Sequence, residues 1–274
     1  MSGINLFIKY AYAPNIRGFC GLREIEIIHD GLFSPDAGQI TEMNIALDSF
    51  TGAVPYLRLI ASANNIRDPF DQRVVEAYWL GNDLLNKVSV TELYDHVRDR
   101  FKSKVRLKTI DLIAGQAAHG AKPHHSYHVF DAFSKTGGFE RLGLSDIALN
   151  RIDECRIGWG KFDRYADNTK SQIVVKYEPI ESLSHVETGP RARLNQRGDD
   201  HIGSSLRSEI QQKTISNEID GRKLFLDLKK SDIVTFHWSR ICDVITKVQA
   251  AKLYTWTLYH LKLVNNSNIL LNSD

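Results

Sequence analysis

The sequence has little of what marks several large classes of protein. Its cysteines are only three, Cys20, Cys155 and Cys242, far apart along 274 residues. An odd number of widely spaced thiols argues against a disulfide framework and suits a reducing compartment. No apolar run reaches the roughly 18 residues of a membrane span, and no signal-peptide pattern marks the N-terminus. We therefore expect a cytoplasmic protein with no membrane partner.

The chain also lacks a strong excess of charge of either sign. Lys and Arg together number 35 and Asp and Glu 33, which leaves a net charge of +2. A strongly basic nucleic-acid-binding protein is therefore excluded as the first hypothesis, and we expect no nucleic-acid partner. The 42% of hydrophobic residues is ordinary for a soluble globular protein.

Several well-known site motifs are missing as well. The sequence contains no glycine-rich phosphate loop, no paired CxxC, no HExxH and no GxSxG. Nucleotide-driven enzymes, zinc fingers, thermolysin-like proteases and α/β-hydrolases are therefore poor first hypotheses. No nucleotide cofactor is indicated.

Hydrophobic periodicity predicts helices through most of the first half of the chain. The expected helices cover residues 4–12, 22–28, 41–50, 55–63, 68–85 and 91–101. In the fifth of these, Asp68 is a suitable N-cap and Pro69 suits the first helical position.

After Gly120 the pattern changes to short runs rich in β-branched and aromatic residues. Strands are expected at residues 127–133, 155–162, 172–177 and 232–238, and a helix at 241–265. The polar stretch 181–222 reads as an inserted mobile loop or hairpin, because so long a structureless segment is unusual inside a compact domain.

These patterns together predict an α+β fold with a helical N-terminal half, a small antiparallel β unit and a closing C-terminal helix. We expect a helical domain at residues 1–118 and a β-rich domain, which includes the C-terminal helix, at residues 119–274.

The densest chemical feature is the segment PHHSYH at residues 123–128. Its three imidazoles, His124, His125 and His128, are candidate ligands for a transition metal such as Ni, Fe or Zn. On a helix these side chains share a face. On a strand, which the apolar run at 129–133 favours, His124 and His128 lie about 13 Å apart and cannot share one ion. The alternative is that they are hydrogen-bonded residues of a sheet.

Thiols beside imidazoles form a second candidate site. Cys20, Cys155 and His128 are candidate catalytic residues, since a thiolate next to a histidine acts as a nucleophile or as a soft metal ligand. Cys242 has apolar neighbours and reads as a small buried residue. Whether these segments meet in space cannot be decided from their spacing.

A ligand-binding role is a third possibility for residues near CRIGWGKF at 155–162. Arg156 and Trp159 lie in this segment, and His237 precedes a second tryptophan. A cation beside an aromatic ring suits an anionic ligand, and a solvated strand face explains the same residues without one.

Several long segments together resemble a known family. They are KYAYAPNIRGFCG, PYLRLIASANNIRDPFDQRVVEAYWLGNDLL, KPHHSYHVF, CRIGWGKF and DIVTFHWSRICDVI, in that order. The resemblance is to an uncharacterised family of bacterial and archaeal proteins, a domain of unknown function, and it covers most of the chain. The genes of that family often lie near those for nickel–iron hydrogenases. The resemblance therefore implies an accessory role, with a hydrogenase subunit or maturation protein as partner.

Three functions remain open on this sequence. The first is an accessory or maturation factor for a metalloenzyme such as a nickel–iron hydrogenase, which binds a partner subunit or a metal through His and Cys. The second is a stand-alone enzyme that uses a Cys nucleophile or a metal-activated water with a His base. The third is an interaction module without chemistry.

Overall fold

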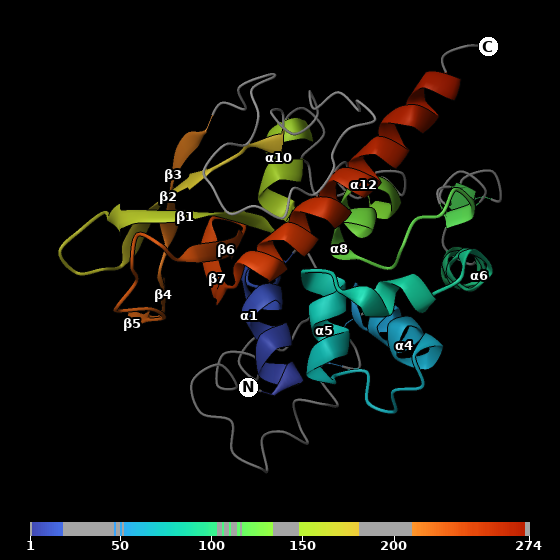
Figure 1. The fold of residues 1–274 in the computed structure, drawn as a ribbon, viewed down its shortest axis with the longest axis horizontal. Coiled ribbons are helices and arrows are strands. Elements are labelled where there is room, and N and C mark those ends of the chain that lie inside the picture. The colour runs from blue at the N-terminus through green and yellow to red at the C-terminus, as the bar shows by residue number, and fades with distance from the viewer. Residues whose placement is uncertain are drawn as a thin grey trace, which may run out of the picture.

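The fold was analysed in a computed structural model (Figure 1). The structure describes residues 2–18, 47, 50, 52–102, 106, 110, 114–115, 117–133, 148–180 and 210–271. Most helices gather on one side of the molecule and the strands on the other, and the long C-terminal helix α12 starts near the middle and extends past α8 toward the upper right (Figure 1). The predicted α+β fold is confirmed. In the described part of the chain, no helix is both long and apolar enough to cross a bilayer.

The N-terminal half is helical because its apolar residues recur at helical spacing and its helices carry good caps. The helices are α1 (Gly3–Asn15), α4 (Val54–Ala63), α5 (Gln72–Trp79), η1 (Asp83–Lys87, 3₁₀) and α6 (Val90–Phe101). At the start of α6, Ser89 and Glu92 form a reciprocal capping box. Helix α5 packs against both α1 and α4 and is central to this layer.

Five strands close into a small barrel in the order β1-β2-β3-β7-β6. They are β1 (Gly158–Tyr165), β2 (Gln172–Tyr177), β3 (Gln211–Ser216), β6 (Ile233–His237) and β7 (Arg240–Ile245). All neighbours are antiparallel except β3 and β7, which meet in parallel where Ser216 pairs with Arg240. A two-stranded ribbon of β4 (Glu218–Ile219) and β5 (Arg222–Lys223) lies beside the barrel.

Four further elements join the helical layer to the barrel. They are α8 (His125–Tyr127), the π-helix η2 (His128–Phe133), α10 (Ala148–Cys155) and α12 (Lys247–Leu271). The largest apolar core draws residues from α1, α4 and α5 and also from β7 and α12. A second apolar cluster fills the barrel around Ile173, Val175 and Phe236.

The predicted strand at 127–133 is wrong, because this segment is helical from His125 to Phe133. The helix begins because the His124 side chain accepts a hydrogen bond from the Ser126 N–H and acts as an N-cap. The aromatic and β-branched residues that favoured a strand instead face the core, where Tyr127 and Val129 are fully buried.

Two other boundaries differ from prediction near the barrel. Cys155 closes helix α10 rather than opening a strand, and the strand begins only at Gly158. Residues 241–245, predicted as the start of the last helix, belong to strand β7 (Arg240–Ile245). The cause is a two-residue hairpin in which Trp238 and Ser239 both have positive φ, at 51° and 55°. That is the backbone of a type I′ turn, for which Asn-Gly is the usual sequence signal.

The helix predicted to begin at Asp68 begins later, at Gln72, with Asp71 as the N-cap of α5. Asp68 instead caps the preceding turn, where its carboxylate accepts a hydrogen bond from the Phe70 N–H. In the polar stretch 181–222, residues 211–216 and 218–219 are strands, and 181–209 lie outside the described residues. The predicted helix at 22–28 lies outside them too, as does most of the one at 41–50.

Candidate metal centre

Three side chains from different parts of the chain converge between the helices and the barrel. His125, Cys155 and His237 each offer one ligand atom, and these atoms lie within 4.8 Å of one another. Among the described residues, this is the group whose His, Cys, Asp or Glu side chains come close enough to share a metal ion. All three residues are buried, with at most 8% of their surface exposed.

His125 is presented by the short helix α8. Its Nε2 donates to the Cys155 carbonyl oxygen at 2.9 Å. The neutral ring therefore keeps its lone pair on Nδ1, which faces the Tyr78 hydroxyl at 3.4 Å. That distance is long for a hydrogen bond to a hydroxyl, so Nδ1 is only weakly engaged. The π-helix that follows is a rare conformation that is frequent at functional sites.

The two neighbours of His125 in sequence are held by a buried polar chain to α12. The Lys122 N–H donates to His260 Nε2 at 3.1 Å, so the neutral His260 carries its proton on Nδ1. This Nδ1 lies 2.7 Å from Ser126 Oγ, which is in turn 2.7 Å from His124 Nδ1. The Ser126 N–H also donates to His124 Nδ1. These bonds fix the backbone on both sides of His125.

Cys155 is placed by its neighbours Glu154 and Arg156. The Glu154 carbonyl accepts from the Trp238 N–H at 2.9 Å, and its carboxylate accepts from the Ser239 hydroxyl at 2.9 and 2.8 Å. These contacts tie the end of α10 to the β6–β7 turn and so bring Cys155 to His237. The buried Arg156 forms an ion pair with Asp153 at 2.8 Å.

His237, the last residue of β6, has the bonding pattern of a metal-ligating histidine. Its Nδ1 donates to the Tyr10 carbonyl oxygen at 2.7 Å. The lone pair of the neutral ring is therefore on Nε2, a buried atom with no hydrogen-bond partner. A backbone carbonyl that orients one ring nitrogen while the other binds the ion is a common arrangement around protein-bound metals.

Aromatic rings enclose the group. The Trp79 ring centroid lies 4.7 Å from that of His125 and 5.9 Å from that of His237, and the two imidazole centroids are 5.1 Å apart. The Tyr10 ring stacks on Trp79, with the two centroids 5.6 Å apart. This surrounding removes water from the imidazoles and favours their uncharged forms.

Burial accordingly lowers the pKa of both histidines of the group. The pKa of His237 falls to about 4, although the carbonyls of Tyr10 and Cys155 act in the opposite direction. The pKa of His125 falls well below its ordinary value, chiefly through burial and then through the neighbouring His237 and His128. Both rings are neutral at pH 7, which is the state that binds metals.

The structure separates the predicted histidine ligands. Only His125 belongs to the convergent group. His124 is an N-cap whose ring stacks with that of His260 at 5.9 Å, and the His128 ring lies 6.1 Å from that of His125. Burial lowers the pKa of both His124 and His128 to about 3.

The remaining predicted site residues fall in different places. Cys155, a catalytic candidate, and His237, a ligand-binding candidate, both join the group. Arg156 lies 5.2 Å above the Trp159 ring, but its other contacts are internal, to Asp153 and to the Glu178 carbonyl. Cys20 lies outside the described residues.

Three further residues lie around the site that the sequence pattern did not single out. His260 is only 1% exposed and its Nδ1 lies 2.7 Å from Ser126 Oγ. Tyr78 and Trp79 line His125. These residues belong to the site because of where α5 and α12 lie in space, and a single sequence does not reveal that arrangement.

Neither curated proteins nor solved structures give a significant match to the chain. A family defined by its sequence pattern does match, over residues 1–270. The resemblance seen in the sequence is thereby confirmed as far as an uncharacterised family is concerned. The chain belongs to the family described as a family of unknown function, DUF6390.

Proposed function

We propose that the protein binds one transition-metal ion through His125, Cys155 and His237. The observation that carries this proposal is the approach of the three ligand atoms to within 4.8 Å in a buried setting. One thiolate and two imidazoles suit Zn, Fe or Ni and do not suit Mg or Ca, which prefer oxygen ligands.

The spacing supports this proposal with a small adjustment. In a tetrahedral zinc site with usual bond lengths, ligand atoms lie roughly 3.3 to 3.6 Å apart. Binding an ion would thus draw the most distant pair together by little more than about 1 Å, a movement within the reach of side-chain rotation. Three protein ligands leave one position for water or for a group from another molecule.

We further propose that the bound metal serves the assembly of a metalloenzyme, such as a nickel–iron hydrogenase, with a hydrogenase subunit or maturation protein as partner. The resemblance to a family encoded near hydrogenase genes supports this role, and so does a ligand set that suits nickel and iron. The open fourth position gives a place where a partner side chain could take over the ion.

Metal binding is tested by elemental analysis of untagged protein purified from a metal-replete host. We expect close to one equivalent of Zn, Fe or Ni, lost in Cys155→Ser and His237→Gln. The matched controls are Cys242→Ser, a buried thiol outside the group, and the exposed His119→Gln, both of which should keep the metal. Metal-free protein that also fails to take up added Zn²⁺ or Ni²⁺ would refute the proposal.

The partner is tested separately, by affinity capture from the native host with the full chain as bait. Recovery of a hydrogenase subunit or maturation protein by the normal chain, and its loss with Cys155→Ser, supports the assembly role. Metal binding without such recovery leaves the site intact and overturns the assembly role.

A second candidate function is a thiol enzyme, because the same geometry puts Cys155 beside two neutral imidazoles, one of which would accept its proton against the burial that lowers the pKa of both. Alkylation of the metal-free protein distinguishes this candidate from the metal site. A Cys155 that iodoacetamide alkylates faster than Cys242 would favour the enzyme, whereas equal inertness of the two thiols would count against it.

A further inference from the structure

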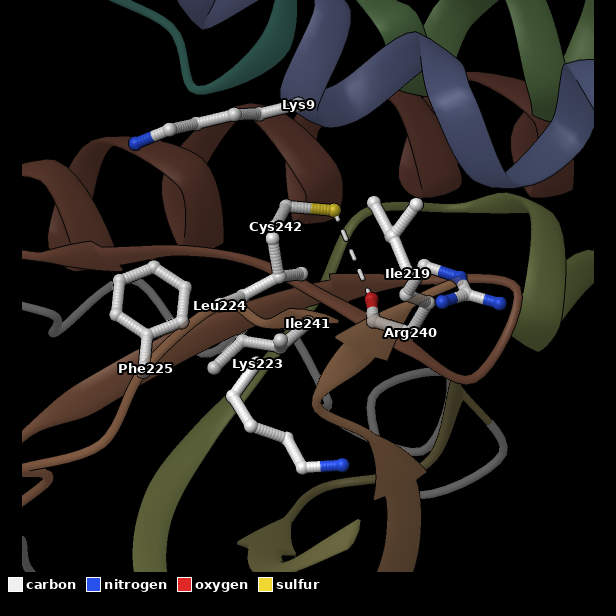
Figure 2. Close-up of a pocket in the computed structure, with 8 residues that line it drawn as sticks. All are labelled: Lys9, Ile219, Lys223, Leu224, Phe225, Arg240, Ile241 and Cys242. Carbon is white, nitrogen blue, oxygen red and sulfur yellow. Dashed lines mark hydrogen bonds between the residues drawn. The ribbon is translucent and has the colours of Figure 1, made fainter. Parts of the chain in front are cut away.

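A separate pocket lies between α1, the β4–β5 ribbon and β7 (Figure 2). Its volume is about 200 Å³. An engineered apolar cavity of about 150 Å³ in another protein accommodates benzene, so this pocket has room for a small organic molecule. It involves none of the three proposed metal ligands.

The inner wall of the pocket is apolar. Ile219 and Ile241 contribute aliphatic surface, Phe225 closes one end, and the Cys242 sulfur points toward the Arg240 carbonyl oxygen at 3.7 Å (Figure 2). Burial and the neighbouring Asp243 raise the pKa of the Cys242 thiol, so it stays uncharged. A ligand body that contacts this wall must itself be apolar.

The charged residues that line the pocket are all cations, and one of them differs from the others. Lys9 pairs with Asp243 at 2.9 Å, and Lys223 pairs with Glu218. The guanidinium of Arg240 forms no ion pair within 4 Å of a described carboxylate, while Asp220 attracts its charge from farther away and the like charge of Arg17 opposes it. It donates instead to the Glu218 main-chain carbonyl.

Arg240 is also held in place by packing, since its guanidinium lies over the Tyr12 ring at 5.5 Å. A partly buried guanidinium without a carboxylate partner is a strong binder of carboxylate or phosphate groups, because its planar fork matches their oxygens.

We propose that this pocket binds a small organic monoanion whose apolar body lies on Ile219, Ile241 and Cys242 and whose anionic group meets Arg240. The volume limits the body to a short chain or a single ring. The ligand class follows from the combination of an apolar wall and one cation at its edge that has no direct ion pair, and it does not depend on the metal.

The test uses ligand-observed NMR titration at fixed ionic strength with three probes. Hexanoate has both the body and the charge, hexanamide has the body alone, and inorganic phosphate has the charge alone. We expect hexanoate to bind at least about tenfold more tightly than either of the others, as the loss of a charge-assisted hydrogen bond would give.

Arg240→Gln should abolish the preference for hexanoate over hexanamide. Arg240→Lys, which keeps the charge, should retain part of it and guards against a simple folding defect. The exposed Lys161→Gln on strand β1 is the matched control and should bind hexanoate normally. Equal binding of hexanoate and hexanamide, an unchanged preference in Arg240→Gln, binding of phosphate as tight as that of hexanoate, or no binding of hexanoate would overturn the proposal.

Discussion

Acid should unfold the metal-free protein well above the pH at which carboxylates titrate, because the structure holds several histidines in the neutral form. His124, His125, His237 and His260 are each at most 3% exposed, and burial lowers the pKa of every one of them. In the unfolded chain a histidine titrates near about 6.5. Below that pH the unfolded state binds more protons than the folded state, so stability present above it is lost as the pH falls toward the folded pKa values.

The pKa values of the folded state set the size of this loss of stability. His237, with a folded pKa of about 4, accounts for a loss of about 3 kcal/mol over the whole range, and His124, at about 3, for about 5 kcal/mol. Near pH 5 each such histidine lowers the free energy of unfolding by up to about 1.4 kcal/mol per pH unit. Four together give up to about 5.5 kcal/mol per pH unit, against a total stability of about 5–15 kcal/mol for an ordinary protein.

The assay is urea unfolding followed by circular dichroism at a series of pH values from 7.5 to about 4.5, with a chelator present. His124→Asn keeps an N-cap acceptor and should reduce the slope by about 1.4 kcal/mol per unit. The exposed His119→Gln should leave it unchanged. A free energy of unfolding that is flat between pH 6 and pH 5 would show that these imidazoles are not held neutral, and the reasoning would fail.

Three further predictions concern the metal, the ion pair and the barrel. At a hundredfold excess over Kd, a bound metal should add about 2.7 kcal/mol to the free energy of unfolding of the normal protein and so raise its melting temperature. Calorimetry of Cys155→Ser should show no such rise. Arg156→Met should cost about 3–5 kcal/mol in urea unfolding because it leaves Asp153 as an unpaired buried carboxylate, and adding Asp153→Asn should restore part of the loss. Gly158→Ala should lower the free energy of unfolding by about 1–3 kcal/mol, because its Cβ would lie 2.2 Å from the Phe236 ring. Gly115→Ala, whose Cβ meets open space, should be close to neutral in thermal unfolding. Equal effects of the two substitutions would contradict this account of the packing.

Local patterns predicted the elements whose signals are local. Strand β2 occupies residues 172–177 as its β-branched run indicated, and α6 starts within one residue of the predicted position, where Ser89 caps it. The β6–β7 hairpin was missed because Trp238 and Ser239 adopt positive φ without the usual Asn or Gly. A backbone of that kind is strained for Trp, and the surrounding contacts rather than the sequence of the turn hold it.

The composition of the site was partly predictable and its assembly was not. The residue types were singled out from their chemistry, and His125, Cys155 and His237 were all among them. Their grouping depends on contacts between residues up to 112 positions apart, which no periodicity encodes. The choice of His125 over His124 and His128 depends on the helical turn at 125–127, whereas the sequence favoured a strand there.

The polar contacts around the three proposed ligands bear on why the core contains them at all. Burying an imidazole with an unpaired nitrogen, such as His237 Nε2, lowers stability. Yet each ligand is positioned by hydrogen bonds: His125 through its neighbour Ser126, Cys155 through its neighbour Glu154, and His237 through the Tyr10 carbonyl.

Such positioning has little value for packing alone, because apolar contacts tolerate small displacements that a coordination site does not. A metal ion would bind the lone pair on Nε2, and this bond would offset the free energy that burying the nitrogen costs. The arrangement therefore predicts a difference between two substitutions of the same residue. His237→Leu should remove metal binding and cost the metal-free protein about 1–3 kcal/mol, because the buried Tyr10 carbonyl loses its partner and Pro14, four residues further along α1, has no N–H to replace it. His237→Gln should also remove metal binding but cost less, because its side-chain amide can still donate to the Tyr10 carbonyl. Urea unfolding of both variants with chelator and elemental analysis of both would test this: equal losses of stability would contradict the role given to the Tyr10 hydrogen bond, and a normal metal content in His237→Gln would exclude His237 as a ligand.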